Sequence, residues 1–418
     1  MLKDLLPKAY VQHLSLPLLG RILNGFDLWL EENGYARPSR RQKISDAVCI
    51  DQYLRRRGAK HLEEITREQL HDCWQQHRQS APFVAATARV LLRFLEERHF
   101  LPPPAPVRLT PSGVQIAAYA SYLKDVRGMV PLSILLHTGT ISRFLKHIQY
   151  DIHPGRLGGL RTATVEDFIK VRAECLGRGT LQHTVAHVRG FLRFLVTTGA
   201  FPADHHIQID TPRLYRLEQL PRALPWKTVR ALLRSIDRTT HAGLRDYAMF
   251  ILIATYGLRA SEIVSLTLDD IFWRDRWLVV RRRKNGVPLR LPLTDSAGTA
   301  LLEYLRRERP ALPHREVFLR ARAPSGVLKP TAVTEAFQAW ARRSGLGIPY
   351  HGPHCLRHSY AVYLLRKGTS LKMIGALLGH RTLESTCVYL RLDTQDLRSV
   401  ALSAPRVHPA PHRKGGRS

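Results

Sequence analysis

Hydrophobic residues recur every three or four positions along most of this chain, which is the spacing of amphipathic helices. Two proline-rich stretches interrupt the pattern. The first, residues 102–106, cannot continue a helix and is typical of a stiff linker, and the second runs from Thr211-Pro212 to Pro225. These breaks predict three domains, at about 1–106, 107–222 and 223–400, and a tail over 401–418 that we expect to be flexible.

The first two predicted domains are helical and resemble each other. Residues 66–70 parallel residues 164–168 at an offset of 98, and residues 91–95 parallel residues 191–195 at an offset of 100. Thr66 and Thr164 are both predicted as helix N-caps, because a glutamate follows each of them two positions later and apolar residues continue at helical spacing. The first domain is either a duplicate of the second or a helical bundle that resembles it by chance.

The third predicted domain combines helices with a β-hairpin. A strongly apolar helix is predicted from His241 to Tyr256, with Gly257 as its C-cap. Residues 277–283 then predict a strand, Asn285-Gly286 is a preferred two-residue hairpin turn, and residues 287–293 predict the returning strand.

Two prolines in the returning strand, Pro288 and Pro292, cannot donate to a sheet ladder and place that strand at an edge. From Pro353 onward the pattern is helical again, with breaks at Gly368 and Gly379. The sequence therefore predicts a mainly α fold with a small β-sheet or hairpin in the third domain, an α+β class.

Composition adds a strong positive charge to this picture. The 418 residues include 64 Lys and Arg against 34 Asp and Glu, a formal net charge of +30. Residues 223–418 hold 33 basic and 14 acidic residues and so carry +19 of it. Such an excess attracts nucleic acid or an anionic membrane surface, although a solvated basic surface needs no partner. We expect the third domain to be the main phosphate-binding part.

Cysteine usage and hydropathy bear on the compartment. Five scattered cysteines without CxxC spacing argue against a disulfide framework or a cysteine zinc site, and they fit a reducing cytoplasm. No apolar run approaches the roughly 20 residues that span a bilayer. The first residues lack the apolar core and cleavage site of a signal peptide. We expect a cytoplasmic protein with no membrane association.

A group of polar residues near the C-terminal end has spacings that suit chemistry on a phosphodiester. His354 and Arg357 lie three residues apart, so they share one face near the start of the helix that begins after Pro353, where free N–H groups favour a phosphate. His380 follows the break at Gly379, and a short helix from about Thr382 would carry Tyr389.

Cutting a phosphodiester with tyrosine requires a phenol with a pKa of about 10 to lose its proton, and a phosphorane to be stabilised. Arginine suits the second task because its planar fork holds two oxygens and stays protonated. Arg259 follows Gly257, and Glu262 could orient it. Lys284, beside the hairpin turn, could protonate the leaving oxygen, whereas the arginines at 281–283 are poor acids.

These segments resemble the catalytic domain of the tyrosine site-specific recombinases, the phage integrase family. Residues 257–262 (GLRASE) resemble the first-arginine motif, residues 354–358 (HCLRH) the HxxRH box, and residues 377–380 (LLGH) the LLGH box, with Tyr389 at the place of the nucleophile. The resemblance covers about 223–400, and residues 107–222 resemble the helical core-binding domain by pattern and position.

The resemblance implies a catalytic set. The implied catalytic residues are Arg259, Lys284, His354, Arg357, His380 and Tyr389. Apart from the resemblance, the place of Arg281, Arg282 and Arg283 beside the hairpin turn favours contact with DNA phosphates over a merely solvated edge strand. The hairpin here reads RRRKNG where the family often has KGxK, so Lys284 is assigned by counting back from residues 291–293.

The implied activity is recombination of double-stranded DNA through a 3′-phosphotyrosyl intermediate, without ATP, metal or cofactor. The helical and catalytic domains would form a C-shaped clamp, acting as a homotetramer on DNA with accessory recombinases. The additional N-terminal domain suggests a transposon- or integrase-type enzyme of a mobile element. Two alternatives stay open, a strand-relaxing enzyme of the type IB topoisomerase kind and a non-catalytic DNA-binding accessory protein.

Other residues of suitable chemistry are predicted to be structural. His354 with His358, and His183 with His187, have the i, i+4 spacing of metal ligands but lack a third ligand nearby, so we predict no metal site. His358 is expected to pack or cap within its helix. Three further tyrosines lie in apolar helices and are expected to pack in the core, namely Tyr256, Tyr360 and Tyr363.

Overall fold

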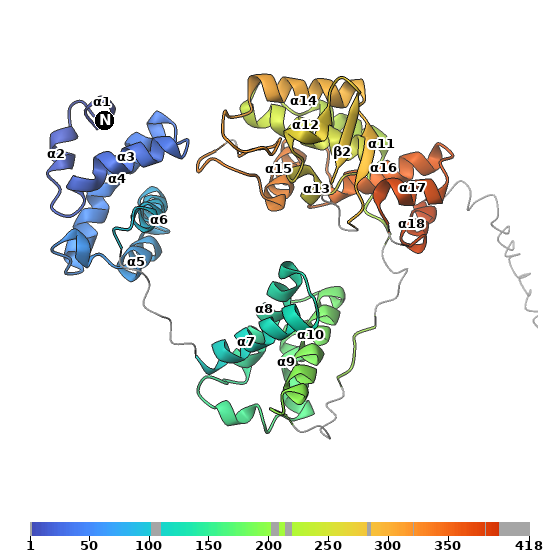
Figure 1. Ribbon diagram of the computed structural model, residues 1–418, viewed down its shortest axis with the longest axis horizontal. Coiled ribbons are helices and arrows are strands. Elements are labelled where there is room, and N and C mark those ends of the chain that lie inside the picture. Colours follow the sequence, from blue (N-terminus) through green and yellow to red (C-terminus); the bar gives the residue numbers. More distant parts are fainter. Residues whose placement is uncertain are drawn as a thin grey trace, which may run out of the picture. The chain divides into compact units, whose positions relative to one another are not determined.

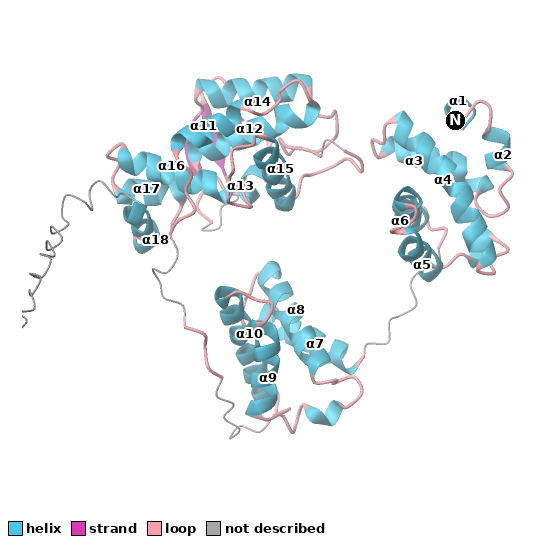
Figure 2. Ribbon diagram, turned by 180° about the vertical axis from the view of Figure 1, so that it is seen from behind, coloured by secondary structure: helices cyan, strands magenta, loops and turns pink. Residues whose placement is uncertain are grey.

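The computed structural model describes residues 2–101, 110–201, 209–213, 220–281, 286–320, 322–380 and 382–392, and these form two compact units (Figure 1). One unit comprises Met1–Pro102 together with Leu220–Ser418, and the other is Pro103–Gln219. Helices dominate both units (Figure 2). The predicted tail over 401–418 lies outside the described residues. No described helix is long and apolar enough to cross a bilayer.

Residues 2–101 fold as helices around their own hydrophobic cluster. The elements are α1 (Leu2–Leu5), α2 (Tyr10–Leu14), a 3-10 turn (Gly20–Ile22), α3 (Leu23–Glu32), α4 (Arg37–Arg56), a 3-10 turn (Leu62–Glu64), α5 (Arg67–His77) and α6 (Pro82–Glu97). In α6, Ala88, Leu91 and Leu95 recur at helical spacing and are completely buried.

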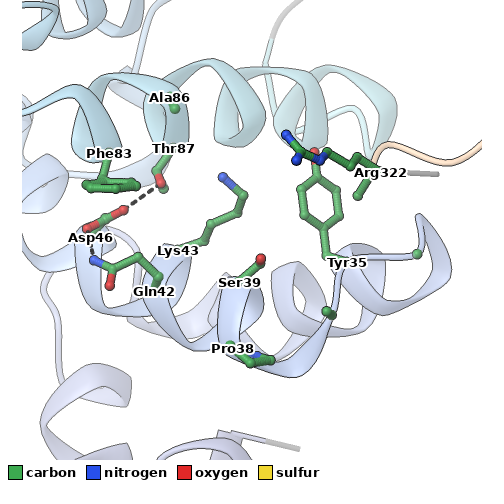
Figure 3. A pocket seen from close by; sticks show the side chains of 13 residues that line it. Tyr35, Pro38, Ser39, Gln42, Lys43, Asp46, Phe83, Ala86, Thr87 and Arg322 are labelled. Atoms are coloured by element: carbon green, nitrogen blue, oxygen red, sulfur yellow. Dashed lines mark hydrogen bonds between the residues drawn. The ribbon is translucent and has the colours of Figure 1, made fainter. Parts of the chain in front are cut away.

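A groove with a volume of about 620 Å³ opens between the first turns of α4 and α6 (Figure 3). Lys43 points into it. On its floor, Asp46 accepts hydrogen bonds from Gln42 and from Thr87 of α6. None of the residues that line this groove belongs to the predicted catalytic set.

The second unit is also built of helices around a hydrophobic cluster of its own. The elements are α7 (Pro111–Ser121), a π-helical turn (Tyr122–Val126), α8 (Pro131–His147), a 3-10 turn (Pro154–Arg156), α9 (Thr162–Ala173) and α10 (Arg178–Thr197). Internal aromatic contacts, such as Tyr119 against Phe191 at 5.2 Å between ring centroids, hold α7 to α10.

Two pairs of helices in α3–α6 and α7–α10 match at their C-terminal ends. The helices α6 and α10 both end before a residue with positive φ, His99 (56°) and Gly199 (72°), at the offset of 100 that the sequence predicted. The helices α4 and α8 likewise end before Gly58 (94°) and Gln149 (54°). A left-handed residue ends a helix by turning its last carbonyls onto following N–H groups, so both bundles use one terminating geometry.

One predicted cap in this repeat is wrong. Thr66 is the N-cap of α5, where it forms a capping box with Gln69. Thr164, in contrast, lies inside α9, and the extended residue before that helix is Arg161. A cap needs extended backbone rather than a helical residue, so the prediction was displaced by three residues.

The C-terminal part of the chain has a mixed fold around a large hydrophobic cluster. The helices are α11 (Trp226–Arg234), α12 (His241–Tyr256), α13 (Ala260–Val264), α14 (Asp295–Arg307), α15 (Pro330–Arg343), α16 (His354–Arg366), α17 (Leu371–Leu378) and α18 (Glu384–Cys387), with 3-10 turns at Leu268–Asp270 and Val388–Leu392 (η6). The strands are β1 (Ile271–Phe272), β2 (Trp277–Val280) and β3 (Leu289–Pro292), which form an antiparallel sheet in the order β1-β2-β3. The α+β prediction is confirmed.

The prolines of the returning strand correctly predicted its position at the edge of the sheet. Pro292 at the end of β3 pairs with Trp277 of β2, and β3 is an outer strand of the three, as its prolines predicted. Both strands are shorter than predicted. The turn residue Asn285 and the end of the first predicted strand lie outside the described residues.

The helix α12 has the bounds that the sequence predicted, and it runs through the middle of the C-terminal fold. Met249, Phe250 and Leu252 are completely buried on different sides of the helix. Gly257 ends it with a φ of 65°, and a Cβ atom there would lie 2.6 Å from Leu378 of α17. This close approach brings the ends of α12 and α17 together.

Gly257→Ala is expected to lower the free energy of unfolding by about 2 kcal/mol, about half from the left-handed backbone and half from the clash with the buried Leu378. Gly368→Ala is the matched control, because Gly368 also has a positive φ (81°) but open space around its Cα. Urea denaturation of both variants tests this. Equal losses for the two would show that the Leu378 contact costs nothing.

Candidate active site

The buried guanidinium of Arg357 is the structural centre of the predicted site. Arg357 lies in the first turns of α16 and is 2% exposed. It donates one hydrogen bond to the backbone carbonyl of Gly257 and another to that of Leu378. These carbonyls stand at the C-terminal ends of α12 and α17, where no helical N–H remains to satisfy them and the helix dipole is negative. Arg357 therefore joins three helices and is itself held rigidly.

Arg259 is held by a buried carboxylate, as the sequence suggested. Its guanidinium donates to Glu262 Oε1 at 2.8 Å, and its backbone N–H donates to Glu262 Oε2 at 2.9 Å. Glu262 is 1% exposed, so the ion pair is shielded from water. A guanidinium anchored in this way keeps its orientation while part of it remains accessible.

Tyr389 lies in η6 and is 1% exposed. Its hydroxyl is 3.0 Å from Nδ1 of His358, and its ring is nearly parallel to that of His380, with 6.2 Å between centroids. Burial raises the pKa of Tyr389 above its ordinary value, while Arg357 and Arg259 pull that pKa down. The electrostatic effect of both arginines on this phenol shows that they gather around it.

His354 and His380 lie in different local environments. The pKa of His354 is lowered to about 4, mainly by desolvation and in addition by the positive charges of Arg357, Arg259 and Arg222. His380 follows the left-handed Gly379, and its Nδ1 lies 2.8 Å from the hydroxyl of Thr386. His354 is therefore neutral at neutral pH and can offer a hydrogen bond rather than a charge.

Five of the predicted site residues come together in this way, and of the other four only Arg281 is described. The five are Arg259, His354, Arg357, His380 and Tyr389. Lys284, Arg282 and Arg283 lie outside the described residues. Arg281 is exposed at the end of β2 and donates from Nε to Asp270 at 2.6 Å.

Two residues that the sequence reasoning did not place also belong to this neighbourhood. His358 was expected only to pack or cap within its helix, but it contacts the hydroxyl of Tyr389. Its position four residues after His354 was a usable signal, because that spacing puts both rings on one helix face. Arg222 lowers the pKa of both His354 and His358. Nothing in the sequence marked Arg222, which lies at a domain boundary.

Tyr256 and Tyr363, which were expected to pack in the core, do so. Tyr256 donates its hydroxyl to the carbonyl of Pro292 at 2.8 Å. The ring of Tyr363 stacks on Trp226 with 4.4 Å between centroids. In the second unit, His187 packs against His137 and contacts the hydroxyl of Thr140.

The chain is similar to known proteins over most of its length. Residues 222–396 match the model of the phage integrase family. A Sinorhizobium fredii (strain NBRC 101917 / NGR234) protein, provisionally named integrase/recombinase y4rA, is 33% identical over 395 residues, which cover 91% of this chain and 93% of that protein. The tyrosine recombinase XerC of Roseiflexus castenholzii (strain DSM 13941 / HLO8) is 31% identical, with 71% of this chain and 93% of XerC covered.

The chain belongs to the phage integrase family. It is accordingly a tyrosine recombinase, an enzyme of site-specific recombination. Relatives with these names favour recombination over the strand-relaxing and non-catalytic alternatives.

Solved structures of recombinases share the fold. The XerH recombinase bound to palindromic difH substrate has a TM-score of 0.54 at 16% identity, with 71% of this chain and 97% of XerH covered. A lambda integrase dimer bound to a COC′ core site has a TM-score of 0.51 at 17% identity, with 77% and 89% covered.

Thr386→Val is expected to slow strand cleavage by the recombinase about tenfold, because His380 loses the hydroxyl that orients it and one such hydrogen bond is worth about 1.5 kcal/mol. Thr386 is completely buried, so the isosteric valine should preserve packing. Thr382→Val, at an exposed position, is the control. Single-turnover cleavage measures both, and equal rates for the two variants would contradict a role for the Thr386 contact.

Proposed function

We propose that this recombinase cuts double-stranded DNA by attack of the Tyr389 hydroxyl on a backbone phosphate. The attack forms a 3′-phosphotyrosyl bond and releases a 5′ hydroxyl. A 5′ hydroxyl from a partner duplex then reverses the step and joins strands in a new combination. The observation that carries the proposal is the burial of one phenol among two anchored arginines and three imidazoles.

Arg259 and Arg357 are proposed to neutralise the phosphorane. Each is fixed before DNA arrives, Arg259 by Glu262 and Arg357 by two backbone carbonyls. Groups that are already oriented need no reorganisation as charge develops, which is the main source of electrostatic catalysis. Loss of one such contact should raise the barrier by roughly 2.7–4 kcal/mol.

The remaining predicted residues supply hydrogen bonds and a proton. His354 and His380 are proposed to hydrogen-bond the phosphorane and to assist proton movement. Lys284 is proposed to protonate the leaving 5′ oxygen, because an ammonium can lose a proton far more readily than a guanidinium. Energy conserved in the phosphotyrosyl bond removes the need for ATP, and this set of residues performs the step without metal or cofactor.

Double-stranded DNA is the proposed partner. The net charge of +30 supplies long-range attraction, most of it from residues 223–418. Known recombinases of the same fold have been seen bound to DNA. Exchange between two duplexes requires four cuts, so we propose a homotetramer on DNA, assisted by accessory recombinases.

The proposed domains are 1–106, 107–222 and 223–400. The matched ends of α3–α6 and α7–α10 support an origin of the first domain by duplication of the second. We propose that both helical domains, with the catalytic domain, clamp the duplex. Tyr389 is 1% exposed, so we propose that DNA binding makes its hydroxyl accessible while η6 keeps its contact with α16.

A suicide substrate nicked next to the cleavage site tests the nucleophile. The wild-type recombinase should become covalently attached to DNA, and Tyr389→Phe should form no adduct because the attacking oxygen is missing. Tyr363→Phe is the matched control, since this tyrosine packs on Trp226. Denaturing gel electrophoresis detects the adduct. An adduct with Tyr389→Phe would assign the attack to another residue.

A further inference from the structure

Attack by a phenol needs a group that takes its proton, and the proposed roles above do not say which imidazole takes the proton of Tyr389. We propose that His358 accepts the proton of Tyr389 during strand cleavage and returns it during rejoining. The inference rests on the proposed role of Tyr389 as nucleophile. It makes His358 a catalytic residue, because its imidazole touches the reacting oxygen.

Geometry singles out His358 among the three histidines. Its Nδ1 lies 3.0 Å from the Tyr389 hydroxyl, within hydrogen-bond distance. The ring of His380 is nearly parallel to that of Tyr389, at an interplanar angle of 19° and with 6.2 Å between centroids, and its Nδ1 is engaged by the hydroxyl of Thr386 at 2.8 Å. His354 instead meets the ring of His358 edge-on, with 4.5 Å between centroids.

The fold fixes the orientation of this imidazole. His358 follows Arg357 in α16, and Arg357 is anchored to the ends of α12 and α17. The next residue, Ser359, is completely enclosed and accepts a hydrogen bond from the backbone N–H of Leu224. The edge-on contact with His354 restricts rotation of the ring. The acceptor nitrogen is therefore held toward Tyr389 before DNA binds.

The protein environment favours a neutral imidazole at His358 and a protonated phenol at Tyr389. Burial lowers the pKa of His358 to about 3, and the neighbouring histidines and the charges of Arg357 and Arg222 contribute to the decrease. His358 is thus neutral at physiological pH and has a lone pair to accept with. Burial raises the pKa of Tyr389, so the phenol keeps its proton in the absence of DNA.

The substrate itself would make His358 more basic. A scissile phosphate bound by Arg259 and Arg357 brings negative charge next to the cations that depress the pKa of His358. The imidazolium that forms on proton transfer is then stabilised by the charge of the phosphorane. The acceptor would be weak without DNA and effective only with a phosphate in place.

The proposed step conserves atoms and charge. As the bond between Tyr389 Oη and phosphorus forms, the O–H bond breaks and the proton moves to Nδ1 of His358. The bond from phosphorus to the 5′ oxygen breaks, and that oxygen takes a proton from the proposed acid, Lys284. In rejoining, the 5′ hydroxyl returns its proton to the lysine, and His358 returns its own to Tyr389.

Single-turnover cleavage of the suicide substrate by His358→Gln and His358→Ala tests the proposal. Removal of a general base should slow cleavage about 10²- to 10⁴-fold. The residual rate of His358→Ala should rise about tenfold per pH unit between about pH 6 and about pH 8, because the phenol must then ionise without help. Added imidazole should restore part of the rate to His358→Ala.

A second substrate separates the two ends of the reaction. When sulfur replaces the bridging 5′ oxygen, the leaving thiolate needs no proton. This substrate should restore cleavage to Lys284→Ala but leave the defect of both His358 variants unchanged. Full restoration of the His358 variants would move His358 to the leaving group and overturn the proposal.

Controls distinguish the remaining outcomes. His351→Ala is matched, since His351 is exposed and contacts Gln338 only through its backbone carbonyl in the described structure. Wild-type cleavage through Tyr389 together with unimpaired His358 variants would refute the inference alone. The His358 variants could instead cleave slowly at a rate that changes neither with pH nor with added imidazole, while binding DNA normally in a mobility-shift assay. That result would refute the inference in favour of a purely structural role for His358. Absence of a Tyr389 adduct in the wild type would refute both the inference and the proposed function.

Discussion

The hydrogen bonds from the buried Arg357 to the ends of α12 and α17 are the constraint on which the rest of the site depends. A buried charge is costly unless its donors are satisfied, and helix-end carbonyls are costly unless something donates to them. Here the donors of Arg357 are satisfied by the carbonyls of Gly257 and Leu378, and those carbonyls are satisfied by Arg357. The same contacts that stabilise the core hold a guanidinium beside the phenol of Tyr389. The packing of the C-terminal fold and the geometry of its site therefore depend on the same hydrogen bonds.

This arrangement concentrates positive charge where water is scarce. Arg259 and Arg357 both act on Tyr389, and the nearby imidazoles remain neutral because the same charges and burial depress their pKa values. Glu262 holds Arg259 and two helix-end carbonyls hold Arg357, so both guanidinium groups are oriented before a phosphate binds. A bound phosphodiester would add negative charge beside them, so in the proposed mechanism DNA binding and activation of the site share one electrostatic cause.

The two helical bundles keep the same helix-end geometry although the side chains that join their helices differ. The ends of α4 and α8 and those of α6 and α10 match, with Gly58 opposite Gln149 and His99 opposite Gly199. At corresponding places in the bundles, the first has an Asp46–Thr87 hydrogen bond and the second has a His137–His187 ring contact. The helical frame tolerates such exchanges because the hydrophobic spacing that builds it is unchanged.

The sequence by itself determined the features that depend on neighbours in the chain. The bounds of α12, its glycine terminator, the edge position of β3 and the order of the site motifs all follow from local spacing and residue type. It failed where a feature depends on contacts between distant segments. The partner of Tyr389 is His358, thirty-one residues earlier, and the cap of α9 lies three residues before the threonine that resembled one. Only the tertiary structure could decide which face of α16 meets η6, because that choice is made by the packing of helices against one another and not by the pattern within any one of them.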